Sequence, residues 1–188
     1  TDIGGFFGAN VNDPYFHELL IRWFQYGCFC PVMRLHGYRW PLQPQQGTTG
    51  GAECVSGAPN EVWSYTTQVY DILSEYLRMR ERLRPYVTKR MQEAHEKGTP
   101  VMRPMFYDFP DDPICWEVET QYLFGPDILV VPITDAGCRT IEVYLPAGAS
   151  WTNAWSGEKF QGGQWITVDA PIEQIPLFAR DGFDIPVH

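Results

Sequence analysis

The sequence has no long apolar run and no excess of basic residues, and these two absences exclude several classes of protein. No stretch approaches the roughly twenty apolar residues that a membrane-spanning helix requires, and no basic start leads into a short apolar run. The formal net charge is -9, and the 14 Lys and Arg are scattered along the chain. Phosphate binding requires a clustered basic surface. We therefore expect neither a membrane nor a nucleic acid as a partner.

Three common patterns of catalytic or phosphate-binding sites are also missing. The sequence contains no Gly-x-Ser-x-Gly elbow, no phosphate-cradling glycine loop and no His-Glu-x-x-His motif. Its five cysteines are an odd number, and the close pair Cys28 and Cys30 has one residue between them where zinc motifs usually have two or more. On a strand, both thiols would lie on one face and pack as small hydrophobic groups. We expect no metal site and no cofactor.

The first half of the chain predicts an alternation of strands and helices. Asp13-Pro14 is a helix start, because Asp13 can cap the free amides and Pro14 lacks a donor at the first helical position. Apolar residues then recur at helical spacing up to Gly27, where we expect the helix to end. Further elements are predicted as strands over 29–35 and 99–106, helices over 61–82 and 85–98, and a long functional loop over 37–60. With the first residues, this order indicates two crossover units of a parallel α/β arrangement.

After Pro110–Pro113 the pattern changes to short β-rich runs separated by turn residues. Turn signals every eight to twelve residues are typical of an antiparallel sandwich or a small barrel. We therefore predict a domain boundary near residue 115, with an α/β part over residues 1–114 and an all-β part over 115–188. Trp151, Trp155 and Trp165 in the second part could form a carbohydrate-binding platform, but filling the sandwich core is the simpler role.

The candidate functional residues lie in two short segments, Asp2-Ile3-Gly4-Gly5-Phe6 and Arg34-Leu35-His36. A carboxylate, an aromatic face, a guanidinium and an imidazole at strand ends could line a pocket for a polyhydroxylated ligand, as at the C-terminal face of a parallel barrel. Arg34 and His36 alternate with Leu35 and would point the same way, with Asp2 as a candidate partner. Each also has a structural alternative: Asp2 could cap a turn, Phe6 could pack in the core, and a lone histidine is often structural.

Other polar and aromatic residues have weaker claims to a site. Arg103 is a charged residue inside an apolar run, and we expect it to form a buried ion pair rather than a ligand contact, because isolated buried charge is unfavourable. Tyr38, Trp40 and Trp63 could line an aromatic subsite or pack against the loop. Besides Asp2, no acidic residue has a convincing strand-end position, since Asp108 lies among aromatic and proline residues.

Six ordered motifs make the chain resemble glycoside hydrolase family 31 over essentially its whole length. They are Asp2-Ile3-Gly4-Gly5-Phe6, Arg22-Trp23-Phe24-Gln25-Tyr26-Gly27, Pro31-Val32-Met33-Arg34-Leu35-His36, Leu83-Arg84-Pro85-Tyr86, Gly98-Thr99-Pro100-Val101-Met102-Arg103-Pro104 and Ile175-Pro176-Leu177-Phe178-Ala179-Arg180-Asp181-Gly182. Members of this family are retaining α-glycosidases with a (β/α)8 barrel followed by β-sandwich domains. The resemblance therefore implies the last part of a TIM barrel over residues 1–114 and the proximal C-terminal β-sandwich domain over 115–188.

The resemblance also implies roles for the candidate residues. Asp2 would belong to the floor of the glycone subsite, and Phe6 would flank the bound sugar. His36 is similar to the residue that hydrogen-bonds the ring hydroxyls, with Arg34 beside it. The nucleophile and acid/base aspartates of the family lie in motifs that this sequence does not contain, and we expect them upstream of Thr1. We therefore expect no catalytic residue in this chain, and no activity without the upstream remainder of its own polypeptide.

The expected partner is an oligosaccharide substrate. The Arg34-Leu35-His36-Gly37 form and the insertions after Phe7 and His36 resemble bacterial α-xylosidases acting on xyloglucan side chains more than starch-type α-glucosidases. An α-glucosidase of the same family and a non-catalytic carbohydrate-binding or scaffold fragment are the alternatives. An incomplete barrel would expose apolar surface and unpaired backbone, so we expect the isolated chain to aggregate or to associate with itself, for example as a homo-oligomer.

Overall fold

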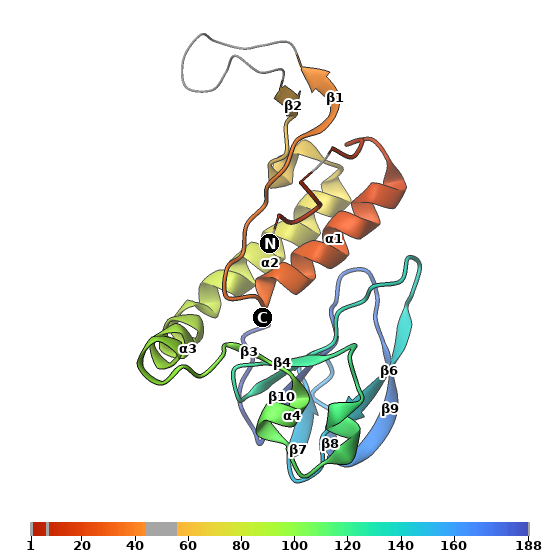
Figure 1. Cartoon of the computed structure of the whole chain (residues 1–188). Coiled ribbons are helices and arrows are strands. Elements are labelled where there is room, and N and C mark those ends of the chain that lie inside the picture. Colours follow the sequence, from red (N-terminus) through yellow and green to blue (C-terminus); the bar gives the residue numbers. More distant parts are fainter. Residues whose placement is uncertain (1, 7, 44–55, 188) are drawn as a thin grey trace.

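The computed structural model describes residues 2–6, 8–43 and 56–187. An N-terminal part, mainly helical, precedes a C-terminal part built of antiparallel strands (Figure 1). The N-terminal elements are α1 (Pro14–Cys28), β1 (Arg39–Gln43), β2 (Ser56–Ala58), the 3-10 helix η1 (Val62–Ser64), α2 (Thr67–Arg82) and α3 (Arg84–Lys97). This order agrees with an α/β part followed by an all-β part.

Helix α1 begins where the sequence predicts and ends one residue later. The Asp13 carboxylate accepts a hydrogen bond of 2.9 Å from the Tyr15 amide, and Pro14 occupies the first turn. Gly27 lies inside the helix, which ends at Cys28. A methyl group at Gly27 would come within 2.5 Å of Ile3 Cδ1. The glycine therefore makes room for the N-terminal segment on α1, and the prediction that it ends the helix is wrong.

Helices α2 and α3 abut, as predicted, with Leu83 as the residue between them. Thr66 caps the start of α2 by accepting a hydrogen bond from the Val69 amide. Helix α3 ends at Lys97 and is capped by Gly98, which has a left-handed φ of 69°, the conformation that glycine adopts without steric cost. Helix α2 packs along α1 (Figure 1), and the core between them contains Phe16, Leu20, Phe24, Leu73 and Tyr76.

The strand predicted over 29–35 is wrong. Of this segment, Leu35 alone pairs, in an isolated parallel bridge with Ile3, whose amide donates to the Arg34 carbonyl at 3.0 Å. A strand requires a partner strand along its length. Among the described residues, the segment 29–35 has one bridge, from Leu35 to Ile3, and no partner strand. Cys28 ends α1 instead of lying on a strand with Cys30. Both thiols are buried and free, so their packing as small hydrophobic groups is confirmed; Cys54 lies outside the described residues.

The loop predicted over 37–60 contains two strands in its described part. Strands β1 and β2 pair antiparallel, with Arg39 opposite Ala58. Residues 44–55, which carry the glycine and threonine run of this loop, lie outside the described residues. The Gly-, Pro- and Gln-rich composition of this segment predicted a loop, although its described part includes two paired strands.

The C-terminal part contains a six-stranded and a two-stranded antiparallel sheet. Its elements are β3 (Met102–Arg103), α4 (Met105–Asp108), η2 (Pro113–Trp116), β4 (Tyr122–Phe124), β5 (Ile128–Val130), β6 (Thr140–Leu145), β7 (Ser150–Asn153), β8 (Lys159–Gln161), β9 (Gln164–Asp169) and β10 (Leu177–Arg180). The larger sheet has the order β3-β4-β5-β10-β7-β8, and β6 pairs with β9. The core includes Leu123, Leu129, Val143, Leu145 and Phe178.

The strand predicted over 99–106 as a barrel strand is also wrong. The strand that forms, β3, is two residues long and pairs antiparallel with β4, with Met102 opposite Phe124. It is therefore an edge of the C-terminal sheet. This pairing favours a domain boundary ahead of β3, and the boundary near residue 115 stays a prediction.

Arg103 forms the buried ion pair that its position in an apolar run predicts. Its side chain is 6% exposed, and Nη1 lies 3.1 Å from both carboxylate oxygens of Asp108. Nε donates to the Pro100 carbonyl at 2.8 Å. Asp108 is thus engaged in holding α4 against β3, which explains why an acidic residue lies among aromatic and proline neighbours.

The three tryptophans of the C-terminal part differ in exposure. Trp151 is fully buried, and its indole N–H donates to the Pro146 carbonyl at 3.0 Å. Trp155 is half-buried and donates to the Ile175 carbonyl at 2.7 Å. Trp165 is 50% exposed, beside Tyr144. Two of the three serve packing, so they do not form a common exposed platform.

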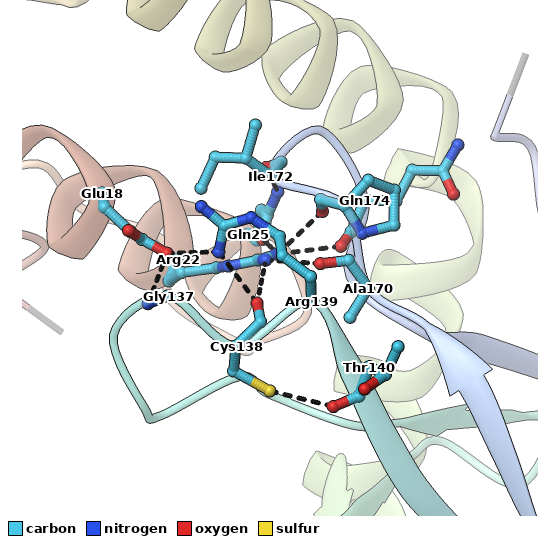
Figure 2. Close-up of polar contacts among 11 residues, drawn as sticks. Glu18, Arg22, Gln25, Gly137, Cys138, Arg139, Thr140, Ala170, Ile172 and Gln174 are labelled. Atoms are coloured by element: carbon cyan, nitrogen blue, oxygen red, sulfur yellow. Dashed lines mark hydrogen bonds and ion pairs between the residues drawn. The ribbon is translucent and has the colours of Figure 1, made fainter.

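Polar contacts from α1 join the two parts of the chain (Figure 2). Arg22 is 6% exposed, and its guanidinium donates to four backbone carbonyls of the C-terminal part. These are Pro171 (3.1 Å), Gln174 (2.9 Å), Cys138 (3.2 Å) and Ala170 (2.7 Å). Burial lowers the pKa of Arg22, but an arginine remains charged at neutral pH.

Two neighbours on α1 extend this contact. One turn after Arg22, Gln25 donates to the Ile172 carbonyl at 2.7 Å. One turn before it, Glu18 forms an ion pair of 2.6 Å with Arg139 (Figure 2), and its pKa is lowered by the hydrogen bond from that guanidinium. Glu18, Arg22 and Gln25 lie on one face of the helix. That face holds both the 136–139 turn and the 170–174 segment.

Asp112 is a buried carboxylate whose loss should destabilise the C-terminal part. Burial alone would raise its pKa, but hydrogen bonds from the Ala147 amide (2.8 Å), the Tyr144 hydroxyl (2.8 Å) and the Ile114 amide (3.2 Å) outweigh burial, so its pKa is lowered. Asp112→Asn should lower the free energy of unfolding at pH 7 by about 1 to 3 kcal/mol, because the amide NH2 would face donors.

The pH dependence of this loss follows from the direction of the shift. A carboxylate with a lowered folded pKa stabilises above its unfolded pKa of about 3.9, and this stability is lost as pH falls through the folded pKa. The difference between the wild type and Asp112→Asn should therefore narrow below about pH 4. Urea unfolding of both proteins at pH 7 and pH 3 measures this difference in the free energy of unfolding. An equal difference at both pH values would contradict this role of the charge.

Candidate functional site

The bridge between Ile3 and Leu35 brings the two candidate segments side by side. Ile3 is fully buried and Leu35 packs against the same core. Because neighbouring residues of extended chain point to opposite sides, Arg34 and His36, which flank Leu35, are placed on the side away from that core. Asp2 directly precedes Ile3 and is half-buried, and its position beside Arg34 and His36 stays a prediction. Phe6 is 50% exposed, and its ring centroid lies 5.4 Å from that of His36. We call Asp2, Phe6, Arg34 and His36 the rim.

Within the rim, Arg34 fixes the hydrogen-bonding role of His36. Arg34 Nη2 lies 3.0 Å from His36 Nδ1. A guanidinium can only donate, so Nδ1 must accept. The ring proton of the neutral imidazole is then on Nε2, which makes His36 a hydrogen-bond donor toward a ligand. Of the predicted site residues, Arg34 and Phe6 both contact His36, and the place of Asp2 in the same site stays a prediction.

The nucleophile and the acid/base aspartates are expected upstream of Thr1, which lies outside the described residues. The upstream position of the two catalytic carboxylates stays a prediction.

The backbone of the first segment is tightly turned. Asp2, Gly4 and Gly5 have positive φ angles of 38°, 84° and 85°, and the Gly5 amide donates to the Asp2 carbonyl at 2.8 Å. Positive φ is uncommon for a residue with a side chain, and aspartate tolerates it better than most. The two glycines are therefore needed for the turn that presents Asp2 and Phe6. The prediction that Phe6 packs in the core, an alternative above, does not fit its exposure.

Sequence reasoning missed Arg39, which is fully buried directly behind this turn. Its Nη1 donates to the Gly5 carbonyl at 2.9 Å and its Nη2 to the Ile3 carbonyl at 3.2 Å. The guanidinium also lies over the Phe16 ring, 5.1 Å from its centroid. A methyl group at Gly4 would come within 2.5 Å of Arg39 Nη2. The one signal in the sequence is a cation between two aromatic residues.

A second chain of hydrogen bonds connects Arg39 to the other segment. Arg39 Nε donates to the Tyr65 hydroxyl at 3.4 Å, which donates to Asn60 Oδ1 at 2.5 Å. Asn60 Nδ2 donates to the Gly37 carbonyl at 3.1 Å, next to His36. Burial raises the pKa of Tyr65, so the hydroxyl keeps its proton. Both segments of the rim are thus connected through the buried Arg39 and the partly buried Tyr65 and Asn60.

Exposed aromatic residues lie in the hairpin beyond the rim. The rings of Tyr38 and Trp40 meet edge to face, with centroids 6.2 Å apart, and both lie against Gly8. Tyr38 is 37% and Trp40 43% exposed, and Trp63 in η1 is 70% exposed. An aromatic subsite formed by these residues stays a prediction.

Within residues 2–6, 8–43 and 56–187, no group of three or more His, Cys, Asp or Glu is placed to hold a metal ion. In the same ranges, no helix has the length and apolar character needed to cross a membrane.

Comparisons with known proteins place the two parts of the chain in order. Residues 1–89 match the model described as the glycosyl hydrolases family 31 TIM-barrel domain, and residues 98–183 match the family 31 C-terminal domain. The chain is 34% identical over 187 residues to an alpha-xylosidase of Saccharolobus solfataricus, covering 100% of this chain and 23% of that protein. It is 33% identical over 182 residues to alpha-glucosidase 2 of Bacillus thermoamyloliquefaciens, covering 96% and 20%.

A solved structure agrees closely with the fold. The GH31 alpha-xylosidase from a soil metagenome, complexed with xylose, has a TM-score of 0.92 and 52% identity, and the match covers 98% of this chain and 28% of that one. The chain therefore spans about a quarter of the length of these proteins, 23% and 28% in the two xylosidases. The predicted order of a barrel end and a β-rich C-terminal domain is confirmed.

Proposed function

Because this chain belongs to glycosyl hydrolase family 31, we propose that it forms the end of the catalytic barrel and the adjoining domain of a retaining α-glycosidase. The observation that carries the proposal is the rim, where an aromatic face, a guanidinium and an imidazole donor lie together at a barrel end. Sugar sites combine such polar groups with an apolar surface. The substrate is an oligosaccharide with a terminal α-linked sugar.

The rim residues bind the sugar, and the reacting carboxylates come from elsewhere. Asp2, Arg34 and His36 hydrogen-bond the glycone hydroxyls, and Phe6 lies along its C–H face. A retaining glycosidase requires two carboxyl groups, one as nucleophile and one as acid/base. Asp108 is engaged by Arg103, and so is not available as the second one. A segment of the same polypeptide upstream of this chain supplies both groups, and this chain alone is inactive.

We propose α-xylosides of xyloglucan oligosaccharides as substrates, with α-glucosides as the alternative. Two xylosidases, one of them complexed with xylose, are among the similar proteins, and the match to the latter reaches 52% identity. An α-glucosidase is 33% identical. Xylose differs from glucose by lacking the hydroxymethyl group on C5. A pocket closed at that position would discriminate by about ten- to two-hundredfold, as for a methylene group in other pockets.

The test uses the complete protein that contains this chain. The kcat/KM for p-nitrophenyl α-D-xylopyranoside should exceed that for the corresponding glucopyranoside by about tenfold or more. Proton NMR of the first sugar released should show the α-anomer. A retaining enzyme forms a covalent intermediate and inverts the anomeric carbon twice, so the α configuration of the substrate is kept. The isolated chain of residues 1–188 is the matched control and should show no turnover. Release of the β-anomer would contradict retention, and a preference for the glucoside would favour the alternative substrate.

A further inference from the structure

We infer that Arg39, Tyr65 and Asn60 form a positioning network that holds the two halves of the rim in register. This inference rests on the proposed function, since it assigns the network to the same sugar-binding site. None of the three belongs to the rim itself. Their effect is exerted through backbone carbonyls that neighbour the rim residues.

Arg39 fixes the first half of the rim. It donates to the carbonyls of Ile3 and Gly5, which stand on either side of Gly4 in the turn between Asp2 and Phe6. The guanidinium is planar and presents several N–H groups in fixed directions, so it can bind both carbonyls at once. A lysine ammonium could not reproduce this geometry. Since Arg39 is fully buried, water cannot replace these bonds without a rearrangement.

Tyr65 and Asn60 connect Arg39 to the second half of the rim, the segment that carries Arg34 and His36. The Tyr65 hydroxyl bonds both Arg39 and Asn60, and Asn60 binds the carbonyl of Gly37, the residue after His36. Gly37 has a φ of 110°, and an added methyl group there would collide with the Gly5 carbonyl oxygen. The backbones of the two segments are therefore in contact at Gly5 and Gly37, the residues whose carbonyls Arg39 and Asn60 bind.

The network has one link that can be removed without altering a rim residue. The Tyr65 hydroxyl joins the arginine end to the asparagine end, while its ring packs near Phe16 and His17. Tyr65→Phe keeps the ring and removes the link. Displacement of a binding group by about 1 Å can reduce a rate by about a hundredfold. We expect a smaller loss here, because Arg39 keeps its hydrogen bonds to Ile3 and Gly5 but loses the hydroxyl that fixes its Nε, so the first segment is loosened rather than released.

Tyr65→Phe in the complete protein should lower kcat/KM for p-nitrophenyl α-D-xylopyranoside by about tenfold. Tyr76→Phe is the matched control. Tyr76 is buried, whereas Tyr65 is partly buried, and the Tyr76 hydroxyl likewise makes two hydrogen bonds. It donates to the Glu173 carbonyl and accepts from the Ile175 amide, both at 3.1 Å, away from the rim. This control should leave kcat/KM within about twofold while losing comparable stability. Equal kinetic losses in the two variants would overturn the inference.

Hydrogen exchange measured by mass spectrometry gives a readout that does not require activity. Tyr65→Phe should accelerate amide exchange in both residues 2–6 and residues 35–38, and Tyr76→Phe in neither. If the wild type hydrolyses neither aryl glycoside, the proposed function fails. Amide exchange in residues 2–6 and 35–38 then still decides whether the network couples the two segments. Unchanged exchange in either segment would overturn the inference. Faster exchange in an active enzyme with unchanged kcat/KM would overturn it as well.

Discussion

Arg22→Met should lower the free energy of unfolding by about 3 to 5 kcal/mol and loosen the contact between α1 and the C-terminal part. Methionine has a similar length and no donor, so four carbonyls lose the guanidinium that now binds them at 2.7 to 3.2 Å. A buried acceptor left without a partner costs about 1 to 3 kcal/mol. Partial access of water to the opened contact keeps the total below the sum of these penalties.

Thermal and urea unfolding of the wild type and the variant measure this loss. Arg139→Met is the matched control, because it removes the nearby ion pair with Glu18, in which the Arg139 side chain is 45% exposed. Exposed ion pairs contribute at most about 1 kcal/mol. Hydrogen exchange should accelerate at residues 170–175 in Arg22→Met and much less in the control. Similar losses in both variants would show that Arg22 does not hold the two parts together.

This role of Arg22 explains one of the motifs that identified the family. In the motif over residues 22–27, Arg22 and Gln25 bind carbonyls of the C-terminal part, and Gly27 leaves room for Ile3. These partners lie far away in the sequence, so the motif could be recognised but not explained from the sequence. In the structure these motif residues have a structural role. They attach both the N-terminal segment that carries Asp2 and Phe6 and the C-terminal part of the chain to helix α1.

Local signals predicted the helices well. Asp13 caps α1, Gly98 ends α3, and Arg103 forms its buried ion pair, because each depends on a few neighbouring residues. The strands over 29–35 and 99–106 were wrong because pairing depends on partners that are distant in the sequence. Apolar runs of this length are compatible with a strand, a bridge or a packed turn. β3 is an edge of the C-terminal sheet because β4 lies beside it.

The rim was predictable, whereas its support was not. Arg34 and His36 alternate with Leu35, which predicts a common side, and Phe6 lies in the other motif; in the structure both Arg34 and Phe6 contact His36. Arg39 follows in a stretch whose composition predicts a loop, and its one signal, a cation between two aromatic residues, does not by itself indicate full burial. Its partners are mostly backbone carbonyls, which every residue possesses. A sequence therefore carries little information about such contacts, although they fix the geometry of the site.

His36→Ala in the complete protein should lower kcat/KM for p-nitrophenyl α-D-xylopyranoside by about ten- to a thousandfold. Arg34 donates to Nδ1 at 3.0 Å, which leaves Nε2–H as the donor that we propose for a sugar hydroxyl. The alanine removes this donor and also leaves the Arg34 guanidinium without that acceptor. The effect should appear in kcat as well as KM, since hydrogen bonds to the sugar strengthen as charge develops in the transition state.

His36→Gln separates the donor from the imidazole ring. A glutamine amide can donate to the sugar and accept from Arg34, so this variant should recover part of the loss. It cannot reproduce the ring contact with Phe6, whose centroid lies 5.4 Å from that of the imidazole. His95→Ala is the control for the loss of a histidine, because His95 lies in the last turn of α3, away from the rim, and its kinetics should match the wild type. Wild-type kinetics in His36→Ala would instead remove His36 from the sugar site and leave the rim without its proposed donor.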